Sequence, residues 1–295
     1  MSSLNLVQSS PGTTGLVDGG TVLQLTPNYD TNPGGALAPA GAAWTTTTVN
    51  VADPFTVNFE FEMSNPTGHL DNGNGGDGIA FVIQDSAAGD TALGLGAGGM
   101  GFLFIPDSVA IMLDTYQNSS PDFYGDPSDN YIAVNTRGTQ FNVPHHYCTD
   151  GLLTADSAIG SDLPGSLGDC TANPTLAMTG GGSAFGSLPA LTTDLDDGKV
   201  HDLEINYTGS VLQVYLDSQL VLSTAIDLAT VLDLAGGTNA YIGFTAGTRF
   251  AYQDQDILSF CYSSAVPEPT LIQLSIPLVM LLGIGIYRRS QRDRA

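Results

Sequence analysis

Strict alternation of apolar and polar residues over 55–63 constrains the fold of this chain more than any other feature. The segment FTVNFEFEM places an apolar side chain at every second position: Phe55, Val57, Phe59, Phe61 and Met63. Successive side chains of a strand point to opposite faces. The pattern therefore predicts a half-buried antiparallel strand, with Glu60 and Glu62 on the solvent side.

Other segments predict further strands. Residues 201–207 alternate in the same way, and the turn Thr208-Gly209-Ser210 joins them to 211–216, as in a hairpin. Short apolar runs at 78–83 and 108–113 are typical of strands buried on both faces. The remaining core strands are predicted at 220–224, 241–245 and 257–262, and a brief helical turn at 228–234. Residues 138–197 are rich in Gly, Ser, Pro and Asp, which favours an inserted loop.

Composition favours the same fold class. Lys199 is the only lysine, and the chain has just four glutamates, whereas helical surfaces usually carry both in quantity. The 36 glycines, with abundant Thr, Val, Asn and Asp, suit short strands joined by tight turns. We therefore predict an all-β protein with two antiparallel sheets packed face to face. Its core should hold Phe55, Phe59, Phe81, Ile111 and Phe244.

Charge is distributed unevenly along the chain. The formal net charge is −23, and four of the seven basic residues lie within 288–295, leaving only Arg137, Lys199 and Arg249 in the body. Such an acidic body repels nucleic acid and anionic lipid, so we expect no nucleic-acid partner. It tolerates divalent cations. Solubility of an exported protein is an equally good reason for the acids.

The C-terminal end differs from the rest. Val266-Pro267-Glu268-Pro269-Thr270 precedes residues 271–287, which are apolar except for Gln273 and Ser275. We predict a linker over 263–270, a transmembrane helix over 271–287 and a basic tail over 288–295. The alternative is a hydrophobic helix packed on the domain, but a segment without a polar face makes a poor surface helix.

The three cysteines do not establish whether the protein resides in an oxidising compartment. Cys148 and Cys170 bracket a loop-like stretch that a disulfide would pin. Cys261 stands in a predicted strand, where we expect a buried thiol.

The C-terminal end resembles the PEP-CTERM sorting signal of Gram-negative bacteria. The resemblance rests on Pro267-Glu268-Pro269, the apolar span and the terminal arginines. It implies removal of the tail by an exosortase-type enzyme, with export to the cell surface or an exopolysaccharide matrix. One feature departs from the pattern, because Met1–Gly20 has neither a basic n-region nor an apolar h-region of a signal peptide.

The body resembles the L-type (legume-type) lectins over nearly all of residues 5–262. Several blocks match in order: GDGIAF at 76–81, LGAGGMGF at 95–102, VAIMLDTYQN at 109–118, GDPS at 125–128, IGFTA at 242–246 and DILSF at 256–260. The resemblance implies a concanavalin A-like antiparallel β-sandwich over residues 1–262 and a carbohydrate-binding function.

By this resemblance, a calcium site lies at the end of the 108–113 strand. Asp114 and Asp126 would supply carboxylates, Tyr116 its carbonyl and Asn118 its side-chain oxygen. Calcium prefers oxygen ligands of these kinds, although Asp and Asn are also common turn residues. The neighbouring transition-metal site of the family is not expected, because Met112 and Tyr131 stand where its Glu and His ligands would be.

The sugar site is likewise implied by the resemblance. Asp77 would accept from sugar hydroxyls after a cis peptide bond from Gly76, and Asn118 would offer its amide. Gly99 would offer its backbone N–H, and Tyr116 or Tyr252 would cover the sugar ring. The loop 247–253 would set the sugar preference, which we do not read from the sequence.

Two other functions compete with a lectin. A glycoside hydrolase on a related sandwich needs two suitably spaced carboxylates, usually from a Glu-x-Asp-x-x-Glu strand. Here Met112 and Gln117 occupy both Glu positions, so we predict no enzyme. The second alternative is a structural matrix protein that keeps the fold without sugar binding.

Overall fold

The computed structural model describes residues 4–35, 37–69, 73–118, 126–144, 175–180, 188–234 and 237–264. Contacts along the chain separate a compact unit, Met1–Ala265, from Val266–Ala295. The predicted linker, apolar helix and basic tail lie outside the described residues. So do Cys148 and Cys170. Within the described part of the chain, no helix is both long and apolar enough to cross a membrane.

The described strands form two antiparallel sheets, as predicted. The first is an eight-stranded sheet, whose strands run in the order β1 (Leu4–Gln8), β4 (Ala40–Thr45), β14 (Asn239–Gly247), β7 (Gly78–Gln84), β8 (Ser108–Asp114), β9 (Tyr131–Thr136) and β10 (Thr175–Met178), with β5 (Val49–Asn50) paired to β14. The second is a seven-stranded sheet in the order β13 (Gln219–Ala225), β12 (Val211–Leu216), β11 (Val200–Tyr207), β6 (Phe55–Gly68), β15 (Ala251–Ser264), β3 (Val22–Thr26) and β2 (Gly15–Val17).

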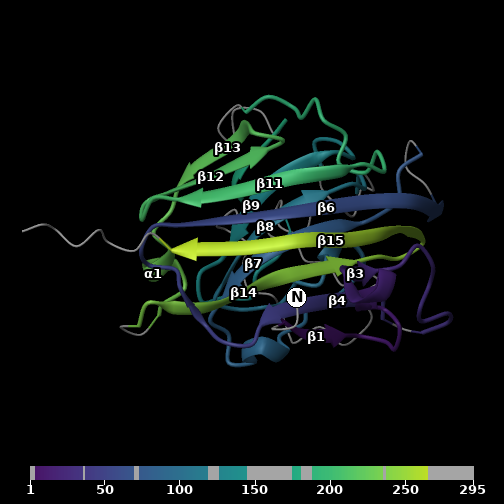
Figure 1. Cartoon of the computed structure of the whole chain (residues 1–295), viewed down its shortest axis with the longest axis horizontal. Coiled ribbons are helices and arrows are strands. Elements are labelled where there is room, and N and C mark those ends of the chain that lie inside the picture. Colours follow the sequence, from purple (N-terminus) through teal and green to yellow (C-terminus); the bar gives the residue numbers. More distant parts are fainter. Residues whose placement is uncertain are drawn as a thin grey trace, which may run out of the picture. The chain divides into compact units, whose positions relative to one another are not determined.

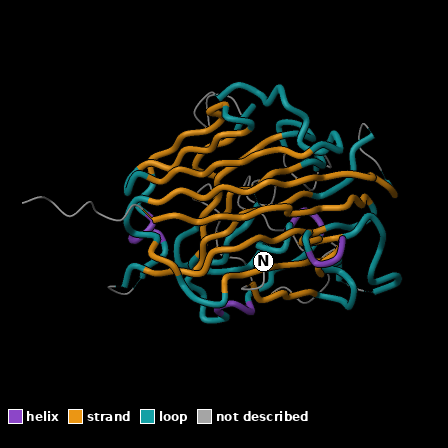
Figure 2. Tube along the Cα trace, in the orientation of Figure 1, coloured by secondary structure: helices purple, strands orange, loops and turns teal. Residues whose placement is uncertain are grey.

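Helical structure is confined to short turns, and Figure 2 shows how strands and loops dominate the described trace. The predicted helical turn at 228–234 is present as α1 (Leu228–Val231), which Asp227 caps by accepting from the Thr230 N–H. Three 3-10 turns complete the helical content of the described residues: Asp18–Gly20, Gly89–Thr91 and Ala97–Gly99. This scarcity fits the predicted all-β class.

The core lies between the two sheets. In Figure 1, β12, β11, β6 and β15 cross in front of β7, β8 and β9. Phe55, Phe59, Phe81, Ile111 and Phe244 are all buried there, as predicted. Alternation along β6 is also confirmed, because Glu60 is exposed whereas its neighbours Phe59 and Phe61 are buried. Burial of these large side chains supplies the main driving force for the sandwich.

Two expectations differ from the structure. The strand β10 lies inside the segment 138–197, where only an inserted loop was predicted, and it pairs antiparallel with β9. The thiol of Cys261 is exposed rather than buried. Cys261 pairs with Asn58 across β15 and β6. It therefore shares the outward face of that sheet, on which alternation also places Asn58.

Candidate functional site

Three neighbouring strands bring the candidate site together at one end of the eight-stranded sheet. Gly78 at the start of β7 pairs with Asp114 at the end of β8, and Asp114 pairs with Tyr131 at the start of β9. Asp77 directly precedes β7, and its carbonyl accepts from the Thr115 N–H at 3.0 Å. Antiparallel register therefore places Asp77, Asp114 and Tyr131 at the same sheet end.

A hydroxyl joins the two carboxylates that were predicted to bind calcium. The Tyr131 hydroxyl lies 2.5 Å from Oδ1 of Asp126 and 3.2 Å from Oδ2 of Asp114. The other oxygen of each carboxylate faces backbone: Asp114 Oδ1 accepts from the Tyr116 N–H at 3.0 Å, and Asp126 Oδ2 accepts from the Asn118 N–H at 2.8 Å. These contacts fix the chain through 114–118 around both carboxylates.

Burial sets the electrostatics of this cluster. Asp77, Asp114 and Asp126 are all at least nine-tenths buried. Burial raises the pKa of Asp114 well above its usual value, and the Asp126 carboxylate raises it further, while the Tyr116 N–H opposes the rise. Burial, followed by the two carboxylates, also raises the pKa of the Tyr131 phenol, so this side chain stays a proton donor.

The residues present fit a calcium ion. Oδ1 of Asn118 is buried and has no hydrogen-bond partner within the described residues. With two buried carboxylates and a neutral amide oxygen, the donors are the hard oxygens that calcium prefers. No group of three or more His, Cys, Asp or Glu side chains suited to a metal occurs in the described ranges. The predicted set adds neutral oxygens from Tyr116 and Asn118 to the two carboxylates.

The surroundings of Met112, where the transition-metal site of the family would lie, are apolar. Met112 is fully buried and belongs with Tyr131, Met178 and Ala133 to one hydrophobic cluster on the outer side of the eight-stranded sheet. A thioether among apolar neighbours offers no hard ligand.

Asp77 is held by backbone and amide contacts from β14 and β15. The predicted cis peptide bond joins Gly76 to Asp77, and the Asp77 N–H donates to the Gly247 carbonyl at 3.0 Å. Gln255 Nε2 lies 3.2 Å from the Gly76 carbonyl and 3.1 Å from that of Gly247. Asp77 Oδ2 is buried and has no hydrogen-bond partner in the described chain. Burial, then Asp126, raises the pKa of this carboxyl well above its usual value, and Arg249 lowers it.

The aromatic and backbone groups predicted for the sugar site do not all lie beside Asp77. The Tyr116 side chain packs on Gly76, where an added Cβ would lie 3.0 Å from that of Tyr116. Gly99 is buried in the turn Ala97–Gly99, and its N–H already donates to the Gly96 carbonyl at 3.0 Å. That turn packs on Gly247, whose added Cβ would lie 2.7 Å from the Ala97 carbonyl oxygen.

Tyr252 is not joined to Asp77 by any described contact. Its ring lies against Gly68 at the end of β6, where an added Cβ would come within 2.8 Å of the ring. Along β15, half-buried Tyr252 alternates with fully buried Gln253. Of the two aromatic candidates, Tyr116 is therefore the one that contacts the Gly76–Asp77 peptide.

Several polar residues of the site were missed by the sequence analysis. Besides the bridging role of Tyr131, Gln255 supports the Gly76 carbonyl. Gln253 Nε2 donates to the Thr115 hydroxyl at 2.8 Å. A signal was present, because the inward positions 253 and 255 of β15 carry glutamine where a core strand would usually carry apolar residues.

Comparison with known proteins gives a family and a set of structural neighbours. The model of the legume lectin beta-barrel domain matches residues 11–259. Comparison with curated protein sequences finds no match.

The solved structures that resemble this chain share its fold at low identity. The VIP36 exoplasmic/lumenal domain, in its calcium- and mannose-bound form, is 18% identical with a TM-score of 0.54, covering 91% of this chain and 86% of that one. The basic winged bean lectin with Tn-antigen is 21% identical with a TM-score of 0.55, covering 91% and 94%. The winged bean acidic lectin with methyl-α-D-galactose is 19% identical with a TM-score of 0.57, again covering 91% and 94%.

Proposed function

Because this chain belongs to the L-type lectin family, whose domain model covers residues 11–259, we propose that it is a calcium-dependent lectin that binds a glycan at the Asp77 end of the eight-stranded sheet. The observation that carries the proposal is a pair of buried oxygens without hydrogen-bond partners in the described chain, Asp77 Oδ2 and Asn118 Oδ1. A buried acceptor without a donor is costly. A sugar hydroxyl and a cation are the partners these two oxygens suit.

The proposed division of labour follows from the contacts of each residue. Asp114, Asp126, the Tyr116 carbonyl and Asn118 Oδ1 would hold the ion. Bound calcium would balance the charge of the two carboxylates and stabilise the 114–118 segment. Asp77 accepts from sugar hydroxyls, and the Asn118 amide donates to the sugar. The Tyr116 ring offers an apolar surface for the sugar ring beside Gly76.

Two structural neighbours support this proposal by what they were solved with. The VIP36 domain was solved with calcium and mannose, and the winged bean acidic lectin with methyl-α-D-galactose. At these sequence identities the neighbours support the fold of this chain, and they do not identify the sugar that it binds. A hydrolase is not favoured, since Met112 and Gln117 occupy the positions of the two glutamates. If the protein binds no glycan, a structural matrix protein on the same fold becomes the favoured function.

The variants Asp77→Asn and Asp126→Asn test the proposal, using the glycan that binds best on an array. Titration calorimetry of each variant with calcium and with that glycan should separate the two roles. Asp77→Asn should abolish glycan binding and leave calcium affinity nearly unchanged. Asp126→Asn should lower both affinities by at least tenfold. Full glycan binding by both variants would overturn the proposed site.

We also propose that the protein is exported and processed at its C-terminal end. The support is the sequence of 267–294, with its Pro-Glu-Pro motif, apolar span and terminal arginines. An exosortase-type enzyme would act while residues 271–287 hold the chain in the inner membrane. The body would then reach the cell surface or an exopolysaccharide matrix. Mass spectrometry of the extracellular protein should find the tail missing; an intact Arg294 end would contradict removal.

A further inference from the structure

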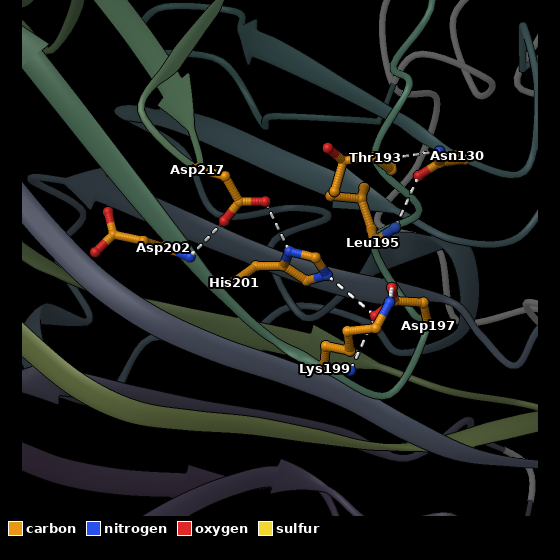
Figure 3. Close-up of polar contacts among 8 residues, drawn as sticks. All are labelled: Asn130, Thr193, Leu195, Asp197, Lys199, His201, Asp202 and Asp217. Carbon is orange, nitrogen blue, oxygen red and sulfur yellow. Dashed lines mark hydrogen bonds and ion pairs between the residues drawn. The ribbon is translucent and has the colours of Figure 1, made fainter.

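A second acidic segment lies beside the Asp77 loop. Asn130, directly before Tyr131, holds this segment on both sides of Asp194. Its Nδ2 donates to the Thr193 carbonyl at 2.8 Å, and its Oδ1 accepts from the Leu195 N–H at 3.1 Å (Figure 3). Leu195 is fully buried in the core. The backbone that carries Asp194 and Asp196 is therefore fixed to the start of β9.

The following residues anchor the same segment to β11. His201 Nε2 lies 3.2 Å from Oδ1 of Asp197, and its Nδ1 lies 2.9 Å from Oδ2 of Asp217. Lys199 also pairs with Asp197 (Figure 3). The Lys199 ammonium and both ring nitrogens of His201 are thus engaged by Asp197 and Asp217, and none of these contacts reaches Asp196.

Asp196 is a buried carboxyl that lacks a well-aligned hydrogen-bond donor. The residue is only 8% exposed, and neither carboxylate oxygen accepts a well-formed hydrogen bond within the described residues, although the Gly75 N–H and the Asp194 carboxyl both lie against it. Burial and then the neighbouring Asp194 carboxyl together raise the pKa of Asp196 to about 8, against the opposing effect of the N–H groups of Gly75 and of Asp196 itself. An ionised Asp196 would therefore need a positive partner that the described side chains do not provide.

The side chain of Gln253 also places an oxygen beside Gly75, the residue whose N–H faces Asp196. It is fully buried, and its Nε2 is held by the Thr115 hydroxyl, which orients the amide. Its Oε1 has no hydrogen-bond partner in the described chain. A Cβ added to Gly75 would lie 2.7 Å from this oxygen. Gly75 is thus flanked by the Asp196 carboxyl and by the unpartnered Gln253 Oε1.

We propose that Asp194, Asp196 and Gln253 form a second cation site, distinct from Asp114 and Asp126, and that its ion is calcium. All three side chains offer oxygen, and the amide oxygen and carboxylates are ligands that calcium accepts. Asp194 is exposed, so water can complete the coordination from that side. The ion would join the 194–196 segment to the Gly75–Asp77 loop, and thereby hold the carboxyl that we assign to sugar.

The competing arrangement needs no ion. A protonated Asp196 could donate to Asp194 and satisfy one of its own oxygens, leaving Gln253 Oε1 without a partner. The two arrangements differ in how many calcium ions the folded chain binds.

Calcium binding to the full chain, measured by equilibrium dialysis and calorimetry at pH 7.5 after removal of chelator, tests the inference. The wild type should bind two ions, and Asp196→Asn should bind one. Asp126→Asn should retain the ion at Asp196. Asp202→Asn, an exposed acid on β11, is the matched control and should bind two.

The outcomes separate this inference from the proposed lectin site. If Asp196→Asn binds as many ions as the wild type with unchanged affinity, the second site does not exist and Asp196 is a protonated acid. If the wild type binds a single ion that only Asp126→Asn removes, the first site stands and the second is overturned. Should Asp196→Asn fail to fold, as judged by circular dichroism, Asp194→Ala decides. This variant should lower the affinity for one of the two calcium ions at least tenfold, and unchanged binding would overturn the inference.

Discussion

The hydroxyl of Tyr131 is the smallest feature on which the candidate site depends. It has one proton, yet it lies within hydrogen-bond distance of carboxylate oxygens from both Asp114 and Asp126. A phenol here ties together two carboxylates that would otherwise repel each other in a buried setting. From the sequence alone, Tyr131 was expected only to stand in place of a metal-binding His. Its bridging role depends on the register that pairs Asp114 with Tyr131, which alternation alone does not specify.

Tyr131→Phe should lower the free energy of unfolding by about 1–3 kcal/mol in chelator, because two buried carboxylates lose their shared donor. Added calcium should reduce this loss. Denaturant unfolding with and without calcium measures both values.

The matched control is Tyr207→Phe, which removes another buried hydroxyl, one that accepts from the Leu228 N–H at 3.2 Å. Its effect should not depend on calcium. A Tyr131→Phe effect that is equally insensitive to calcium would contradict the proposed coupling between the hydroxyl and the ion site.

Asp256, on the β15 face that also carries Asp254, gives a pH-dependent prediction. Burial and then the Asp254 carboxylate together raise its pKa to about 7, against the opposing hydrogen bond from Gln24. Between about pH 4 and 7, the unfolded carboxyl has lost its proton while the folded one keeps it. The free energy of unfolding therefore falls as the pH rises through this window.

Asp256→Asn should remove this contribution. The variant should match the wild type in Tm at pH 4 and exceed it by a few degrees at pH 8. Thermal unfolding across this range measures the difference, with Asp202→Asn as the exposed control. A difference that stays constant from pH 4 to 8 would show that Asp256 does not titrate as described.

At the scale of strands, the quality of the prediction followed the length and regularity of the pattern. The long alternating strand β6 and the apolar strands β7 and β8 were predicted within a few residues of their ends, except that β6 continues to Gly68. The short strands β1 to β5, β9 and β10 were not predicted. A strand of two to six residues between Gly, Pro and Asn carries too little periodicity to distinguish it from a loop.

The strand β6 also provides the test of the core. Phe59 is buried, with ring centroids 5.0 Å from Phe244 and 6.2 Å from Phe81 across the sandwich. Phe59→Ala should lower the free energy of unfolding by about 3–5 kcal/mol, because it leaves a cavity between the two sheets. Phe250→Ala, at a side chain 61% exposed, should change it by less than about 0.5 kcal/mol. Similar losses in denaturant unfolding for both variants would contradict the assigned core.

At the scale of the whole molecule, the fold gathers acidic side chains from distant segments at one end of the sandwich, near the loop that carries Asp77. The formal net charge of −23 destabilises the compact state by self-repulsion. Two acid pairs, Asp114 with Asp126 and Asp194 with Asp196, adjoin the loop that carries Asp77. The order of the sequence blocks allowed Asp77, Asp114 and Asp126 to be predicted together. The pair at 194–196 was missed, because only the folded chain brings that segment beside Gly75.

Cation binding and sugar binding should therefore be linked. If calcium stabilises the loops that carry Asn118 and Asp77, it must raise the sugar affinity, and sugar must raise the calcium affinity by the same factor. Loss of the ion should also lower Tm, since a ligand that binds only the folded state stabilises it.

The most direct test is glycan affinity measured by calorimetry on one protein sample in calcium, after chelation, and after calcium is restored. The account predicts binding in the first state, at least a tenfold loss in the second and full recovery in the third. Glycan binding that is unchanged by chelation would contradict a calcium-organised sugar site.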